Sequence, residues 1–124
     1  MLNIVCPARY VFDKKTIRDA VDKMYSTKEI NLKQILNIVF VGTRKMRAIA
    51  NTYKKEDEAL PVLAFAYRDI DMEGEQLLGE IFLCYPQVVL LAAERNKKVD
   101  TMIIRLIEHG LDNILADKST PLQG

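Results

Sequence analysis

Apolar and polar residues follow one another in blocks along this chain, and the spacing within each block predicts its local structure. Short apolar runs rich in Ile, Val and Phe predict strands over residues 2–6, 35–41, 62–67 and 78–84. Apolar residues at helical spacing predict helices over about 13–24, 44–54, 86–96 and 100–115. The resulting order, β-α-β-α-β-β-α-α, favours an α+β fold in which helices pack on a small mixed four-stranded sheet.

Single residues refine this outline. Asp13 is expected to cap the first helix and Asp100 the last, because an aspartate accepts hydrogen bonds from the free amides at a helix start. Pro86 suits the first turn of the third helix, and Gly79 inside a strand predicts close approach of another backbone. The wide apolar stripe of the last helix predicts that it is central and buried. We expect the two adjacent strands to form a hairpin and the run at 2–6 to be an edge strand.

Length and composition narrow the class of protein. A chain of 124 residues with 49% apolar and 28% charged residues fits one folded domain over residues 1–124, and excludes a disordered or collagen-like chain. Cys6 and Cys84 stand far apart with no CxxC pair, which favours reduced, inert thiols in a cytosol. No apolar run has the length of an export signal or a membrane span. We therefore expect a cytoplasmic protein with no membrane partner.

Charge is distributed unevenly although the net charge is only +1. Residues 1–55 carry 12 basic and 4 acidic side chains, residues 56–84 carry 1 and 8, and residues 85–124 carry 5 of each. A basic first half is typical of a protein that binds the phosphates of RNA. The alternative is a set of solvated helix faces that pair with the acidic segment after folding.

Common catalytic templates are missing. His109 is the only histidine, and neither a G-x-S-x-G nucleophile motif nor a glycine-rich phosphate fingerprint occurs. A thiol enzyme built on Cys6 or Cys84 would lack any recognisable motif. The residues therefore argue against a nucleotide-binding enzyme of the common types.

Three phrases stand in order between residues 35 and 116. The first phrase is a strand, then a helix with a tyrosine and a basic residue near its end, then a charged link and a strand similar to Val-Leu-Ser-Phe. In this chain the matching residues are Ile38 to Val41, Asn51, Tyr53, Lys54, Asp57 and Val62 to Phe65. The second is a Leu-Gly-Asp-like strand, here Leu78 to Leu83. The third begins a histidine motif, here His109 and Gly110. Together these phrases resemble the YbeY-type endoribonucleases, a family of bacterial rRNA maturation factors, most strongly over residues 35–116. The further C-terminal helix usual in the family is expected to be absent.

The resemblance implies a zinc-dependent, single-strand-specific endoribonuclease, but the zinc motif is degenerate. The family places histidines at i, i+4 and i+10, whereas here His109 is followed by Asn113 and Ser119. Amide and hydroxyl groups are weak ligands for zinc, so we expect zinc to bind weakly or not at all. His109 is then either a surviving metal ligand or an ordinary polar residue. The carboxylates of Glu108, Asp112 and Asp117 could complete a mixed site with His109, or they are ordinary carboxylates on a helix surface.

The basic residues carry the predicted RNA contacts. Lys54 occupies the place of the family's arginine and is the candidate catalytic cation at the phosphate, or else a solvated lysine at a helix end. The candidate RNA-binding residues are Arg44, Lys45, Arg47 and Lys55. Two functions remain open: an endoribonuclease acting on rRNA, or a catalytically inactive module that binds RNA, the ribosome or a protein. We expect no DNA partner, and the sequence predicts no particular oligomeric state.

Overall fold

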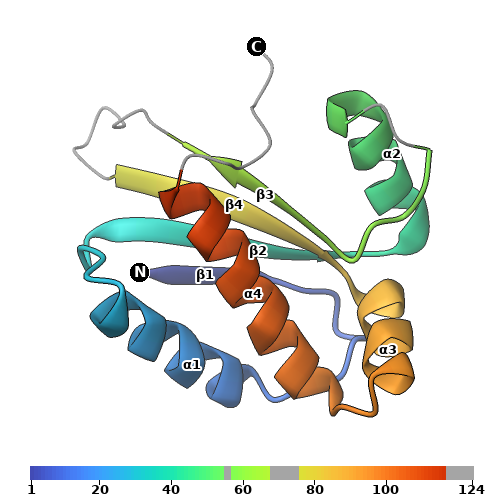
Figure 1. Ribbon diagram of the computed structural model, residues 1–124, viewed down its shortest axis with the longest axis horizontal. Coiled ribbons are helices and arrows are strands. Elements are labelled where there is room, and N and C mark those ends of the chain that lie inside the picture. Colours follow the sequence, from blue (N-terminus) through green and yellow to red (C-terminus); the bar gives the residue numbers. More distant parts are fainter. Residues whose placement is uncertain (55–56, 68–75, 117–124) are drawn as a thin grey trace.

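A computed structural model describes residues 1–54, 57–67 and 76–116 of the chain (Figure 1). Within these residues it contains four strands and four helices in the order predicted from the sequence. They are β1 (Leu2–Val5), α1 (Lys14–Thr27), β2 (Gln34–Val41), α2 (Thr43–Lys54), β3 (Val62–Ala66), β4 (Gln76–Cys84), α3 (Tyr85–Glu94) and α4 (Val99–Leu115). The predicted α+β class and the mixed four-stranded sheet are confirmed.

The sheet has the strand order β1-β2-β4-β3. β1 pairs parallel with β2, and β2 pairs parallel with β4. β3 pairs antiparallel with β4, which confirms the predicted hairpin. β1 lies at an edge, as expected, and the centre is formed by β2 and β4, two strands that α2 and β3 separate along the chain.

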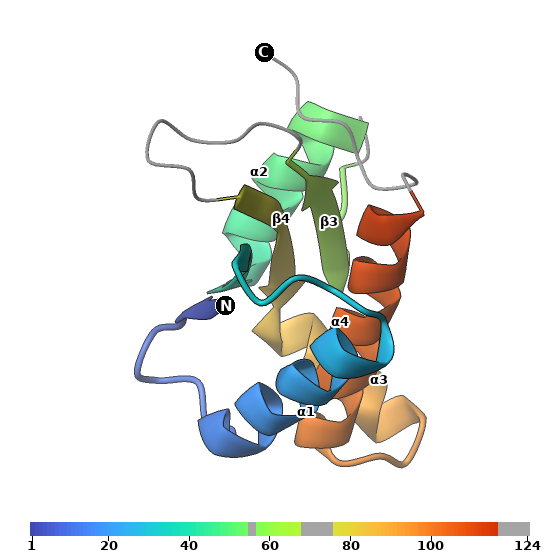
Figure 2. The same ribbon diagram turned by 90° about the vertical axis from the view of Figure 1, so that its left-hand side faces the viewer.

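The helices cover the two faces of the sheet unequally (Figure 2). α1 and α4 pack on one face against Leu36, Ile38 and Ile81, whereas α2 packs on the other face against Leu63 and Phe65. The alternation of side chains along each strand produces this division. Among the described residues, no helix is both long enough and apolar enough to cross a bilayer.

α4 forms the centre of the larger core. Its residues Ile103, Ile107 and Leu111 are completely buried, which confirms that the apolar stripe predicted in this helix faces the core. Near its C-terminal end, Ile114 lies over Gly79 of β4. A Cβ atom added at Gly79 would be 2.6 Å from the Phe65 carbonyl oxygen and 2.7 Å from Ile114 Cδ1. The predicted close approach at this glycine is therefore confirmed.

The helix ends agree with prediction at two positions and differ at one. Asp13 is the N-cap of α1, where its carboxylate accepts a hydrogen bond from the Thr16 amide at 3.2 Å. Pro86 lies in the first turn of α3, as expected. The expectation for Asp100 is wrong, because α4 begins earlier and its N-cap is Lys98. Asp100 lies instead in the first turn, where its negative charge interacts favourably with the helix dipole.

Candidate functional site

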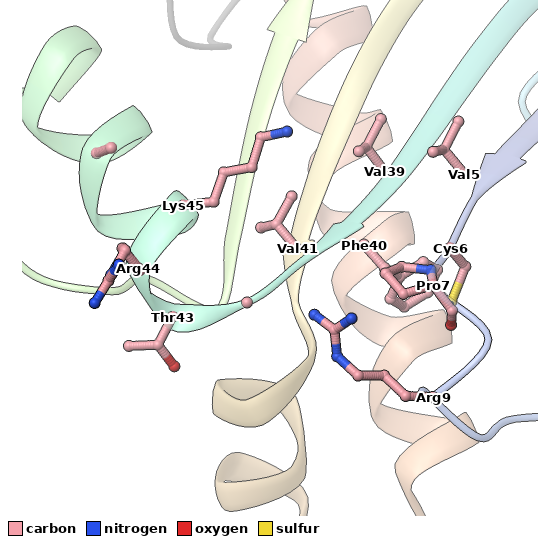
Figure 3. A pocket seen from close by; sticks show the side chains of 12 residues that line it. Val5, Cys6, Pro7, Arg9, Val39, Phe40, Val41, Thr43, Arg44 and Lys45 are labelled. Atoms are coloured by element: carbon pink, nitrogen blue, oxygen red, sulfur yellow. The ribbon is translucent and has the colours of Figure 1, made fainter.

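A crevice opens where β1 and β2 end. After β1 the chain runs to α1 on one face of the sheet, and after β2 it runs to α2 on the other face. The segments that follow these two adjacent parallel strands therefore separate at the carboxyl ends of the strands. Between them lies a cavity of about 710 Å³ (Figure 3). Ligands of open α/β sheets bind at this kind of divergence.

The lining of the crevice combines an apolar wall with positive charge. Val5, Val39 and Val41 contribute apolar surface, and the cations are Arg9, Arg44 and Lys45. None of the described residues that line it is acidic. Such a lining attracts an anion that also carries an apolar part.

Aromatic contacts hold Arg9 in place. The Tyr10 ring stacks on the Tyr85 ring with centroids 4.5 Å apart, and Tyr85 Oη donates a hydrogen bond to the Val11 carbonyl at 2.7 Å. The Arg9 guanidinium lies 4.8 Å from the centre of the Tyr10 ring, and its Nη2 donates to Tyr10 Oη at 3.3 Å. α3 thereby positions the segment after β1, and Arg9 keeps further N–H donors for a ligand. Arg9 was not among the site residues predicted from the sequence. Its position soon after an apolar strand was the one local feature that could have indicated a role at the strand end.

The predicted basic residues divide along α2. Arg44, Lys45, Arg47 and Lys54 are all exposed, and none of them forms an ion pair with any described residue. Arg44 and Lys45 line the crevice, whereas Arg47 does not. Lys54 follows Arg44 by ten residues, or about 15 Å along the helix. Lys55 lies outside the described residues, so its predicted role stays a prediction.

His109 lies on a different face of the molecule from α2. It is exposed on α4, and its neighbour Gly110 packs toward Ala64 and Ile81 on the sheet face opposite α2. Asn113 Nδ2 lies 3.4 Å from His109 Nε2. The i and i+4 positions therefore project from one side of α4, as the spacing predicts, but this side presents one imidazole and one amide.

Two of the candidate carboxylates on α4 pair with a lysine of the described chain. Lys28 Nζ lies 2.6 Å from Asp112 Oδ1 and 3.6 Å from Glu108 Oε2, which joins the end of α1 to α4. The hydrogen bond to Asp112 is the main reason that the pKa of Lys28 is raised above its ordinary value. Within the described part of the chain, no three histidine, cysteine or acidic side chains form a group that could hold a metal ion. Asp117 and Ser119 lie outside it.

A pair that the sequence analysis missed lies on the α2 face of the hairpin. Tyr67 Oη donates a hydrogen bond to Glu80 Oε1 at 3.0 Å. Burial, followed by the nearby Glu80 carboxylate, raises the pKa of Tyr67 to about 12. Tyr67 is therefore a protonated donor at neutral pH. Strand pairing rather than local pattern brings the two residues together on one face of the sheet.

The two thiols are free and offer no activated nucleophile. Cys84 is completely buried. Cys6 Sγ donates to the Pro7 carbonyl at 3.3 Å, and burial raises the pKa of its thiol. Because the thiolate is the reactive form, this environment argues against thiol chemistry in the crevice.

Comparisons with known proteins agree on one family. The family model described as Endoribonuclease YbeY matches residues 9–115. The Thermodesulfovibrio yellowstonii endoribonuclease YbeY is 27% identical over 108 residues, which cover 80% of this chain and 68% of that protein. The Azoarcus endoribonuclease YbeY is 35% identical over 80 residues, covering 61% of this chain and 32% of that protein. This chain thus matches only part of the length of these relatives.

A solved structure has the same fold. The solution structure of TM1509 from Thermotoga maritima superimposes with a TM-score of 0.59 over 90% of this chain and 69% of that one. The two sequences are 21% identical, so this likeness concerns the fold alone.

Proposed function

Because the chain belongs to the YbeY endoribonuclease family, we propose that it binds RNA in the cytoplasm and acts in rRNA maturation, with the ribosome as a further partner. The observation that carries the proposal is the exposed basic surface of α2 and the crevice, which we call the basic surface: Arg9, Arg44, Lys45, Arg47 and Lys54. None of these side chains is neutralised by a described carboxylate. Five of the eight acidic side chains of residues 56–84 lie outside the described residues, so the alternative of basic faces paired with this segment stays a prediction.

RNA binding follows from the electrostatics of this surface. Each lysine or arginine that contacts a phosphate displaces a condensed counterion, so affinity falls as salt rises. Phosphate contacts of this kind position a strand without reading its bases. We therefore expect binding that depends on salt and little on sequence.

Lys54 is the residue we propose to steady the phosphate nearest a scissile bond. It lies exposed at the C-terminal end of α2. A lysine keeps the positive charge of the arginine that it replaces in the family pattern, but it lacks the planar fork that holds a phosphate through two parallel hydrogen bonds. Orientation of the phosphate is then less strict.

The zinc implied by the family does not fit the residues on α4. Tetrahedral catalytic zinc sites use three protein ligands drawn from imidazole, thiolate and carboxylate groups. Here His109 faces the Asn113 amide, and the Lys28 ammonium lies between the carboxylates of Glu108 and Asp112. The positive charge of Lys28 therefore opposes binding of a second cation at these carboxylates. We infer weak or absent zinc binding and derive no hydrolytic step through the metal.

This donor set favours the second candidate function, a family member that binds RNA without cleaving it. The discriminating experiment measures cleavage of single-stranded RNA with added zinc, with EDTA and with neither. Salt-sensitive binding without cleavage in all three supports the binding module. Cleavage that EDTA abolishes supports the endoribonuclease.

Elemental analysis tests the metal separately. The purified protein is expected to contain far less than one zinc per chain, and His109→Ala is expected to leave that content unchanged. Stoichiometric zinc that is lost in His109→Ala would overturn the inference. Absence of any RNA binding at low salt would overturn the proposed function as a whole.

A further inference from the structure

We propose that the crevice between β1 and β2 binds a nucleoside phosphate monoester, either the terminal nucleotide of an RNA strand or a free nucleoside monophosphate. For the RNA strand, the proposal rests on the RNA binding proposed above. It adds a distinct subsite that recognises a chain end, formed by residues remote from His109.

Topology places the crevice where ligands bind in related architectures. β1 and β2 are neighbours and parallel, and the helices that follow them lie on opposite faces of the sheet. Neither following segment therefore covers the space directly beyond the two strand ends. The resulting cavity of about 710 Å³ falls within the ~300–1,000 Å³ typical of small-molecule sites.

The charge of the crevice matches a monoester better than an internal phosphodiester. Its three cations come from two separate segments: Arg9 follows β1, and Arg44 and Lys45 begin α2. Figure 3 shows Arg9 extending from the first segment toward the end of β2, where Thr43 starts the helix. A monoester carries about −1.5 to −2 charges at neutral pH, whereas each internal phosphate of a strand carries one. Three cations with no acidic residue among the described lining favour the more highly charged group.

The apolar wall accounts for the rest of the ligand. Val5 is 58% exposed although it belongs to a strand, and the half-buried Val39 continues the same surface on β2, whereas Val41 is only 4% exposed. The exposed part of the apolar wall is therefore formed mainly by Val5 and Val39. A ribose and base attached to the phosphate would bury it, and burial of apolar area is favourable. Inorganic phosphate alone leaves the wall exposed and should bind more weakly.

The experiment compares ligands that differ only in the terminal phosphate. Binding is measured for one oligoribonucleotide with a 5′-phosphate, with a 3′-phosphate and with neither, and for a nucleoside monophosphate, the nucleoside and inorganic phosphate. We expect one phosphorylated end to bind at least about tenfold more tightly than the unphosphorylated strand, as charge-assisted hydrogen bonds imply. The nucleoside monophosphate should bind more tightly than the nucleoside or inorganic phosphate.

Matched variants locate the effect. Arg9→Gln and Arg44→Gln each remove one cation from the crevice and should abolish most of the preference for the phosphorylated end. Arg47→Gln removes the same charge one turn along α2, outside the crevice. It should weaken binding of both strands alike and leave their ratio unchanged. Thermal unfolding verifies that each variant is folded, and the two crevice variants serve as independent tests.

The outcomes separate this proposal from the proposed function. Preference for a phosphorylated strand supports a chain-end subsite, whereas tight binding of the nucleoside monophosphate without RNA binding supports a small-molecule site and overturns the RNA function. Equal binding of all strands together with no binding of the nucleoside monophosphate overturns the crevice proposal while RNA binding stands. A preference that survives both Arg9→Gln and Arg44→Gln also overturns it.

Discussion

Gly79 is the residue at which a single added methyl group has the clearest consequence. Its Cβ position is 2.6 Å from the Phe65 carbonyl oxygen, which is backbone and paired within the sheet. We predict that Gly79→Ala lowers the free energy of unfolding by about 1–3 kcal/mol, since overpacking of this kind forces backbone shifts. Urea unfolding at neutral pH measures the change.

Gly42 provides the control for that substitution. An added Cβ there meets the Tyr10 hydroxyl at 3.2 Å, and this is the end of a side chain rather than backbone. Gly42→Ala should therefore cost less than Gly79→Ala. Equal losses in the two variants would contradict the explanation by backbone contact.

Lys28 is the second residue with a measurable role. Its ammonium pairs with Asp112 and Glu108 while its side chain is only 17% exposed. Both carboxylates are more than half exposed, so solvent screens the pair, and we expect a coupling energy of about 1 kcal/mol or less between Lys28→Met and Asp112→Asn in a double-mutant cycle. The exposed pair Lys15–Asp19 should give a smaller value.

The coupling of Lys28 should depend on pH in one direction. The hydrogen bond to Asp112 raises the pKa of Lys28 above the ordinary 10.5. Its stabilising contribution is then complete below the unfolded pKa and is lost as pH rises through the folded pKa. A coupling energy that grew between pH 9 and pH 11 would contradict this account.

At the scale of elements, α2 carries the test of RNA binding. We predict that the double variant Arg44→Glu with Lys45→Glu weakens RNA binding at least about tenfold for unrelated sequences. The slope of log affinity against log salt should decrease in magnitude by about 0.7 for each single-strand phosphate that the variant no longer neutralises. Filter binding or fluorescence anisotropy across a salt series measures both quantities.

The matched control reverses two exposed lysines on another element. Lys97→Glu with Lys98→Glu makes the same change of net charge between α3 and α4, outside the basic surface. Its salt slope should remain near that of the unaltered protein. A similar loss of RNA affinity in both double variants would indicate an effect of net charge rather than a binding surface. Unchanged RNA affinity in the α2 variant would mean that Arg44 and Lys45 give no support to an RNA-binding function.

The elements themselves were largely predictable from sequence because their signals are local. Asp13 marks the start of α1 through a hydrogen bond only three residues along, with Thr16. The prediction that Asp100 is an N-cap was wrong because aspartate is favourable both as an N-cap and within the first turn of a helix. Only the backbone conformation distinguishes the two positions. The parallel pairing of β2 with β4 depends on residues such as Ile38 and Ile81, which no local pattern connects.

For the molecule as a whole, we predict lower stability at alkaline pH. Burial raises the pKa of both Tyr25 and Tyr67 to about 12, so the folded state retains their protons where the unfolded chain, with a pKa near 10, releases them. The free energy of unfolding must then fall as pH rises from 10 toward 12. Urea unfolding at pH 9 and pH 11 should show this loss.

Substitution of single tyrosines identifies which hydroxyl groups cause the loss of stability at alkaline pH. Tyr67→Phe should reduce the dependence on pH, although it leaves the Glu80 carboxylate without its hydrogen bond and lowers stability at neutral pH. Tyr10→Phe is the comparison, because Tyr10 shares the aromatic contacts of the crevice but lies outside the hairpin. A fall in stability between pH 9 and pH 11 that is equally steep in Tyr67→Phe would exclude Tyr67 as a source.

The candidate site was predictable only in part, because it is assembled from distant segments. The positive charge of Arg44 and Lys45 at a helix start is visible in the sequence, as is the altered histidine motif at Asn113. The contribution of Arg9 depends on Tyr85, whose ring stacks on Tyr10 from a helix far along the chain. Similarly, only the packing of α1 on α4 shows that Lys28 occupies the carboxylates beside His109.

The separation between the crevice and His109 bears on whether the two can be altered independently. None of the described residues that line the crevice belongs to α4, and distant sites contribute independently to stability and binding. Substitutions on the exposed side of α4 are therefore expected to leave the crevice unchanged. Binding in the crevice and metal binding at His109 can then be altered one at a time, without loss of the folded state.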